Sequence, residues 1–242
     1  MPDAPDTFMR IHPPTPEHPL LGLTVLVVED SRFACEAMRL LCLRSGARIR
    51  RADSLRAARR HLAVYRPVVL IVDLGLPDGS GEELIRELDN ARPRVPVILG
   101  TSGDDNAEAA ARRAGADGFL AKPVSSLEAF RAEVLRHLPR DMRPHRLQAV
   151  SGDMITPDPL ALRDDLRHAA ELLRRPAADR RPVAYLAQFL SGIALLARDP
   201  ALGQAARRLE ACHRKGAPTG AALKRLAALL DTRLHRPHGI LG

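Results

Sequence analysis

The sequence predicts an α/β domain with a doubly wound parallel sheet of five strands, followed by a small all-α helical bundle. Between residues 23 and 138, short runs rich in Val, Leu and Ile alternate with helical patterns. Such alternation is typical of a parallel sheet with helices on both faces. Beyond residue 158 only helical patterns remain, and the short segments between them favour antiparallel helices.

The central strand is the apolar run 68–72, which ends at Asp73 and is followed by a loop rich in Gly and Pro. A short apolar run bounded by turn residues is typical of a strand buried on both faces. Asp73 is then expected at the carboxyl end of the strand, where open α/β sheets bind ligands.

The other elements are predicted from periodicity and caps. We expect strands at 24–28, 47–51, 95–99 and 117–121, the second being a charge-protected edge strand. Helices are expected at 32–44, 54–65 and 80–91. A fourth is capped by Asp104 or Asp105 and ends at Gly115, and a fifth is capped by Ser125 or Ser126 and reaches residue 138.

The composition and the predicted elements divide the chain into four parts. Residues 1–22 carry repeated Pro without periodicity and are predicted to be a disordered leader, 23–138 form the α/β domain, and 139–157 form a linker. Residues 158–236 form the helical output domain, with helices at 159–175, 182–198, 200–213 and 219–234. The second of these is apolar over most of its surface, as expected for a central helix.

Polar side chains follow four of the five strands. Glu29 and Asp30 follow the first, Asp73 the third, Thr101 the fourth and Lys122 the fifth. Strand ends of a parallel sheet share one edge, so these groups should converge. Three carboxylates require a cation, and Mg²⁺ suits them. Lys122 and Thr101 could then hold a phosphoryl group, with Asp73 as the nucleophile.

Residues 23–138 resemble the receiver domain of bacterial two-component response regulators. The resemblance rests on Val-Val-Glu29-Asp30-Ser, Asp73-Leu-Gly-Leu-Pro77-x-x-x-Gly81, Gly-Thr101-Ser and Gly-Ala-Asp-Gly-Phe119-Leu-Ala-Lys122-Pro123. It implies a flavodoxin-like fold with strand order 2-1-3-4-5.

The resemblance also implies site roles. Asp73 accepts phosphate from a sensor histidine kinase or a phosphotransfer protein. Glu29, Asp30, Asp73 and the backbone carbonyl of Gly75 bind Mg²⁺.

Further roles concern the phosphorylated state. Thr101 and Lys122 bind the phosphoryl oxygens, and Thr101 with Phe119 forms a switch that alters the surface of residues 104–138, a possible homodimer interface. A cis Lys122–Pro123 bond would aim Lys122 at the site.

Two positions depart from the family's usual pattern. Gly75 and Gly103 lie two residues beyond Asp73 and Thr101, where the family often has polar side chains beside the water that hydrolyses the aspartyl phosphate. Neither glycine can position that water, so we expect slow autodephosphorylation.

Composition leaves the output open. The net charge is +8, most of it in residues 141–242, which allows DNA binding through 200–236. However, no DNA-reading motif is evident, and a protein-interaction bundle is favoured over a DNA-binding regulator. A phosphotransfer bundle is poorly supported, because His213-Arg-Lys-Gly216 is one residue short of His-x-x-Lys-Gly and His168 has no such motif.

The sequence also suggests a location. No apolar run is long enough for a membrane span, and residues 1–22 lack the apolar core of a signal peptide. A cytoplasmic protein without a membrane partner is therefore expected.

Overall fold

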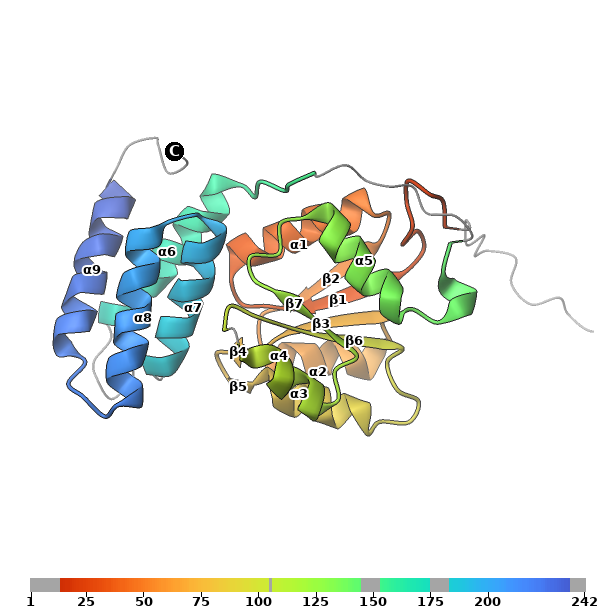
Figure 1. The fold of residues 1–242 in the computed structure, drawn as a ribbon, viewed down its shortest axis with the longest axis horizontal. Helices are drawn as coiled ribbons and strands as arrows, with labels where there is room; N and C mark the ends of the chain where they lie inside the picture. Colours follow the sequence, from red (N-terminus) through yellow and green to blue (C-terminus); the bar gives the residue numbers. More distant parts are fainter. Residues whose placement is uncertain (1–13, 105, 145–152, 175–182, 236–242) are drawn as a thin grey trace, which may run out of the picture.

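The computed structural model describes residues 14–104, 106–144, 153–174 and 183–235. At its centre is a sheet of five parallel strands, namely β1 (Thr24–Val28), β2 (Arg48–Ala52), β3 (Val69–Asp73), β6 (Val97–Ser102) and β7 (Gly118–Ala121). Their spatial order is β2-β1-β3-β6-β7, which is the predicted order 2-1-3-4-5 (Figure 1). The predicted doubly wound fold is confirmed.

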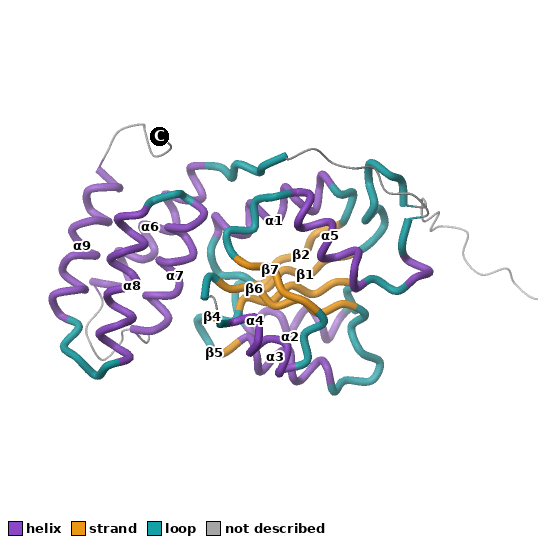
Figure 2. The backbone as a smooth tube through the Cα atoms, viewed as in Figure 1, coloured by secondary structure: helices purple, strands orange, loops and turns teal. Residues whose placement is uncertain are grey.

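Helices cover both faces of this sheet (Figure 2). One face packs against α1 (Arg32–Arg44) and α5 (Leu127–His137), and the other against α2 (Leu55–Val64), α3 (Gly81–Asp89) and α4 (Ala107–Ala114). Successive side chains of a strand point to opposite faces. In β3, Ile71 therefore packs with α1 and α5, whereas Leu70 and Val72 pack with the other three helices. Burial on both faces explains why the central strand is apolar throughout.

The junctions between strands and helices mostly follow the predicted caps. Ser31, Ser54 and Ser126 each accept a hydrogen bond from the backbone N–H three residues later. The cap predicted for α4 is wrong for Asp104, because Asn106 is the N-cap residue and makes no side-chain capping bond. The Asp104 carboxylate instead closes a turn with the Asn106 N–H at 3.0 Å, so the helix begins later. Asp105 lies outside the described residues.

The loop after β3 contains a further element that the sequence did not predict. Two-residue strands β4 (Gly75–Leu76) and β5 (Gly79–Ser80) pair as an antiparallel hairpin before α3 begins. This hairpin holds the loop that follows Asp73.

The predicted disordered leader is wrong for residues 14–22. Leu20 is fully buried in the core between the sheet, α1 and α5, and its N–H donates to the carbonyl of Ser45 at 2.9 Å. Arg131 of α5 also donates to the carbonyl of Glu17 at 2.8 Å. A single apolar side chain among prolines has no periodicity, which is why the sequence pattern missed it. Residues 1–13 lie outside the described part of the chain.

The segment predicted as a linker packs partly against the α/β domain. It contains the 3-10 helix η1 (Arg140–Met142), and its residues 145–152 lie outside the described residues. Met154 pairs with Ser126, and Ile155 is buried in the same core as Leu20, with its N–H donating to the carbonyl of Ser125 at 2.7 Å. The chain is thus held to the α/β domain just before the bundle starts.

The C-terminal helices α6 (Pro159–Arg174), α7 (Val183–Leu196), α8 (Pro200–Arg214) and α9 (Gly220–His235) form the predicted bundle. In Figure 1, α7 lies between α8 and the α/β domain. Phe33 of α1 is only 1% exposed and belongs to the same apolar cluster as Leu166 of α6 and Phe189 of α7. The two domains therefore share a core. Among the described residues, no helix is long and apolar enough to cross a membrane.

Candidate functional site

Three carboxylates gather at the carboxyl edge of the sheet. Glu29 and Asp30 directly follow β1, and Asp73 ends β3, the neighbouring strand. Each offers an oxygen, and these oxygens lie within 4.8 Å of one another. The convergence expected from the strand ends is therefore present. Carboxylate oxygens at this separation suit a hard divalent cation.

Lys122 brings a positive charge to this cluster from the end of β7. Its Nζ lies 2.6 Å from Glu29 Oε2 and 2.8 Å from Asp73 Oδ2. The other oxygen of Asp73 accepts the backbone N–H of Gly75 at 3.2 Å. The Lys122–Pro123 peptide bond is cis. Asp73 thus has a cation on one oxygen and a backbone donor on the other.

Burial opposes the ionisation of the acidic cluster. It raises the pKa of Glu29 to about 8, against the lowering effect of Lys122, and nearby Asp73 adds to the rise. It likewise raises the pKa of Asp30 to about 7. Burial alone would lower the pKa of Lys122, but the charges of Asp73 and Glu29 raise it above its ordinary value. Lys122 therefore stays protonated, and a further cation would favour the ionisation of Glu29 and Asp30.

The predicted switch residues lie beside this cluster. Thr101 pairs in register with Asp73, and its hydroxyl donates to the carbonyl of Leu120 in β7 at 2.7 Å. Phe119 is half-buried and packs against the apolar core on the side of α2, α3 and α4. In this conformation the Thr101 hydroxyl is bonded to β7, so its role as a phosphoryl ligand remains a prediction.

One face of α7 lies over the same edge of the sheet. The Tyr185 hydroxyl donates a hydrogen bond to Asp30. Further along the helix, a Cβ atom at Gly192 would lie 3.9 Å from Nζ of Lys122. Residues spaced by three or four positions share a helix face, and the residues of this face are Tyr185, Gln188, Gly192 and Leu195.

Asp165 of α6 joins the two domains from the other side. It is only 2% exposed, and its carboxylate accepts the Ser31 hydroxyl at 2.7 Å and the N–H groups of Arg32 and Phe33 at 2.9 and 3.0 Å. These N–H groups begin α1 and have no partner within that helix. Burial raises the pKa of Asp165, against these hydrogen bonds. A side chain of one domain thus completes the helix cap of the other.

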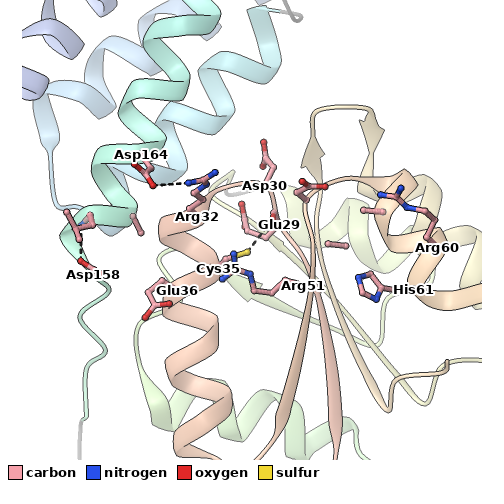
Figure 3. Close-up of a pocket in the computed structure, with 15 residues that line it drawn as sticks. Glu29, Asp30, Arg32, Cys35, Glu36, Arg51, Arg60, His61, Asp158 and Asp164 are labelled. Atoms are coloured by element: carbon pink, nitrogen blue, oxygen red, sulfur yellow. Dashed lines mark hydrogen bonds and ion pairs between the residues drawn. The ribbon is translucent and has the colours of Figure 1, made fainter. Parts of the chain in front are cut away.

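Two cavities lie beside Asp30. The larger, of about 820 Å³, is lined by charged side chains of both signs, including Arg51, Arg60 and Asp164 (Figure 3). The smaller, of about 380 Å³, is lined by Asp30, His168 of α6 and Tyr185. Because Asp30 lines both, α7 covers the acidic cluster without sealing it.

The sequence pattern identified the side chains of the sheet edge but none of those on the helical domain. Asp165, Tyr185 and Gln188 carry no motif that relates them to Asp73. The one available signal was that 182–198 is apolar on most sides, which indicates a helix buried on more than one face. His168 lines the smaller cavity, and its ring packs edge-on against Phe189 at 5.9 Å. His213 is exposed on α8.

Comparison with known proteins identifies relatives of the α/β domain. Residues 25–134 match the family model described as the response regulator receiver domain. The KDP operon transcriptional regulatory protein KdpE of Escherichia coli is 34% identical over 116 residues, which cover 47% of this chain and 52% of that protein. The virulence transcriptional regulatory protein PhoP of Salmonella typhimurium is 34% identical over 104 residues, covering 42% and 46%.

Solved structures are also similar to part of this chain. That of a two-component response regulator from Clostridium difficile is 21% identical, has a TM-score of 0.45, and is matched over 49% of this chain and 98% of its own. The chain spans about half the length of the first curated relatives that it matches.

The contacts of Asp165 predict a specific stability effect. Asp165→Ala should lower the free energy of unfolding by about 2 to 3 kcal/mol, because two buried donors and one partly buried donor lose their shared acceptor. The matched control is Asp164→Ala, whose more exposed carboxylate forms ion pairs with Arg32 and Arg167 and should cost less than about 1 kcal/mol. Urea denaturation measures both, and equal losses would contradict the proposed cap.

Proposed function

Since residues 25–134 are a response regulator receiver domain, we propose that this chain is a phosphorelay protein that accepts a phosphoryl group on Asp73. The carrying observation is the position of Asp73 at the sheet edge, with Lys122 Nζ 2.8 Å from one oxygen and two further carboxylates beside it. The donor is the phosphohistidine of a sensor histidine kinase or a phosphotransfer protein. Asp73 attacks the phosphorus, and the donor imidazole leaves.

The acidic cluster supports magnesium as the metal of this reaction. Glu29, Asp30, Asp73 and the backbone carbonyl of Gly75 would hold Mg²⁺, whose oxygen-rich ligand preference fits this donor set. When bound, Mg²⁺ supplies positive charge where the phosphoryl group meets the carboxylate.

The remaining side chains act on the phosphorylated state. Lys122 binds an oxygen of the phosphoryl group, and this contact partly replaces its ion pair with the Asp73 carboxylate. Thr101 turns its hydroxyl from the Leu120 carbonyl toward the phosphoryl group, and Phe119 moves inward behind it. The surface of residues 104–138 is altered as a result and is a candidate for homodimerisation.

For the helical domain we propose a protein-interaction output. Its α6 and α7 already form an interface with the α/β domain, through Asp165, Phe189 and Tyr185. A phosphoryl group on Asp73 adds negative charge beneath this interface, which gives phosphorylation a direct effect on the surfaces that the helical domain presents.

DNA binding is the second candidate output. Six basic side chains of α8, α9 and the turn after α8 are exposed, namely Arg207, Arg208, Arg214, Lys215, Lys224 and Arg225. If they bind DNA, the logarithm of the association constant should fall linearly with the logarithm of salt concentration, with a slope near the number of phosphates contacted. Fluorescence anisotropy of a labelled duplex with the full chain measures this, and absence of binding at low salt would leave these residues as solvated surface.

The phosphoacceptor is tested directly with a small donor. Incubation with acetyl phosphate and Mg²⁺ should add the mass of one phosphoryl group to the wild-type chain, because Asp73 is the proposed nucleophile, and none to Asp73→Ala. The exposed Asp141 of η1 provides a matched control, since Asp141→Ala should label as the wild type does. Intact-mass spectrometry is the measurement, and full labelling of Asp73→Ala would refute the assignment.

The raised pKa values predict how metal binding depends on pH. Mg²⁺ should bind at least about tenfold more tightly at pH 8 than at pH 6, because Asp30 and Glu29, with pKa values raised to about 7 and about 8, must lose their protons to bind the ion. Isothermal titration calorimetry at both pH values measures the change. Asp30→Asn should show weaker binding and a smaller change, whereas a wild-type affinity independent of pH would contradict the prediction.

A further inference from the structure

The helical domain fills a space that the α/β domain leaves empty beside Asp73. Gly75 has no side chain, and a Cβ atom built there would lie 2.2 Å from Cδ, 2.3 Å from Oε1 and 2.4 Å from Nε2 of Gln188. The carboxamide of Gln188 thus occupies the volume in which a side chain at position 75 would begin. Since the Gly75 N–H bonds to Asp73 Oδ1, the amide lies next to the phosphoacceptor loop.

The neighbours of Gln188 on α7 hold it at this place. Three residues before it, Tyr185 bonds to Asp30, and four residues after it, Gly192 passes close to Lys122. Further along, Leu195 fills the equivalent space at Gly103, where a Cβ would lie 3.1 Å from its Cδ1. The Leu195 side chain is aliphatic, whereas the Gln188 amide can both accept and donate hydrogen bonds.

We propose that Gln188 is a catalytic residue for dephosphorylation, so that the helical domain acts as a built-in phosphatase element for Asp73. This inference rests on the proposed function, because it requires phosphorylated Asp73 as the substrate. The amide holds and orients the attacking water, a role for which a Gln side chain suits phosphoryl transfer. The slow autodephosphorylation expected from Gly75 and Gly103 then applies to the α/β domain alone.

The chemical step uses only water and the acyl phosphate. The water oxygen bonds to phosphorus, the bond between phosphorus and the Asp73 oxygen breaks, and its electron pair stays on the Asp73 carboxylate. The second product is inorganic phosphate, which keeps both protons of the water at the moment of release. Gln188 takes no proton, since an amide is neither a useful base nor a useful acid, and its contribution is position.

Water can approach this place as far as Asp30, although α7 covers the sheet edge. The cavities of about 820 and 380 Å³ both reach Asp30, and the smaller is also lined by Tyr185, one helical turn from Gln188. If the interface with α7 only shielded the acyl phosphate from water, the opposite result would be expected. Loosening the interface would then admit water and shorten the lifetime of the phosphorylated form.

The lifetime of the phosphorylated full-length chain therefore tests the proposal. After labelling with acetyl phosphate and removal of the donor, Gln188→Ala should keep its phosphoryl group at least about tenfold longer than the wild type, because the attacking water loses its orienting group. Gln204→Ala, at an exposed position of α8, is the matched control and should decay as the wild type does. Intact-mass spectrometry at successive times measures the decay.

A rescue variant distinguishes a catalytic role of Gln188 from a role in packing the two domains together. In Gln188→Ala the space at position 75 is free, so adding Gly75→Asn should bring a carboxamide back and restore faster decay. An unchanged or shortened lifetime in Gln188→Ala would overturn the inference, as would failure of the double variant to accelerate decay. If neither wild type nor variant takes up phosphate, the proposed function itself fails, and this inference fails with it.

Discussion

One buried ammonium group allows three carboxylates to stand together at the edge of the sheet. Lys122 lies within 2.8 Å of both Glu29 and Asp73, in surroundings where burial penalises the charges of Glu29 and Asp30. Its attraction to the two acids outweighs its own desolvation, so it remains a cation. Because Lys122 follows β7, Glu29 follows β1 and Asp73 ends β3, this charge balance exists only when the sheet has its full strand order.

The charge balance also explains how the helical domain is held. A cluster with unbalanced negative charge would repel the buried carboxylate of Asp165, yet Asp165 lies at the start of α1, where backbone N–H groups and the helix dipole favour an anion. Phe33, the second residue of α1, packs in the apolar core of the helical bundle. Polar and apolar contacts thus meet within one turn of α1, immediately after Glu29 and Asp30, the pair proposed to bind the metal. Ser31 links this pair to the domain interface, since its N–H donates to Glu29 and its hydroxyl to Asp165.

The sequence predicted the α/β domain far better than the interface. Strand ends can be inferred from short apolar runs, and parallel topology brings their ends to one edge, so Glu29, Asp73 and Lys122 could be grouped without coordinates. Phe33 illustrates the limit, since its helical spacing indicates a buried residue but not whether the α/β core or the bundle buries it. Leu20 was missed because one apolar residue among prolines forms no pattern. Contacts between domains depend on which surfaces meet, and no local periodicity encodes that.

The composition of α7 indicates that this helix does more than pack against the α/β domain. The helix is almost wholly apolar, and Leu195 shows that an aliphatic side chain can fill the space above a loop glycine. At Gly75, however, the helix presents the half-buried side chain of Gln188, and covering an amide costs free energy unless it finds hydrogen-bond partners. A leucine there would dock without that cost. Tyr185 bonds to Asp30 of the acidic cluster, and Gln188 lies against the loop that follows Asp73, where a metal ion, a phosphoryl group and water can supply such partners.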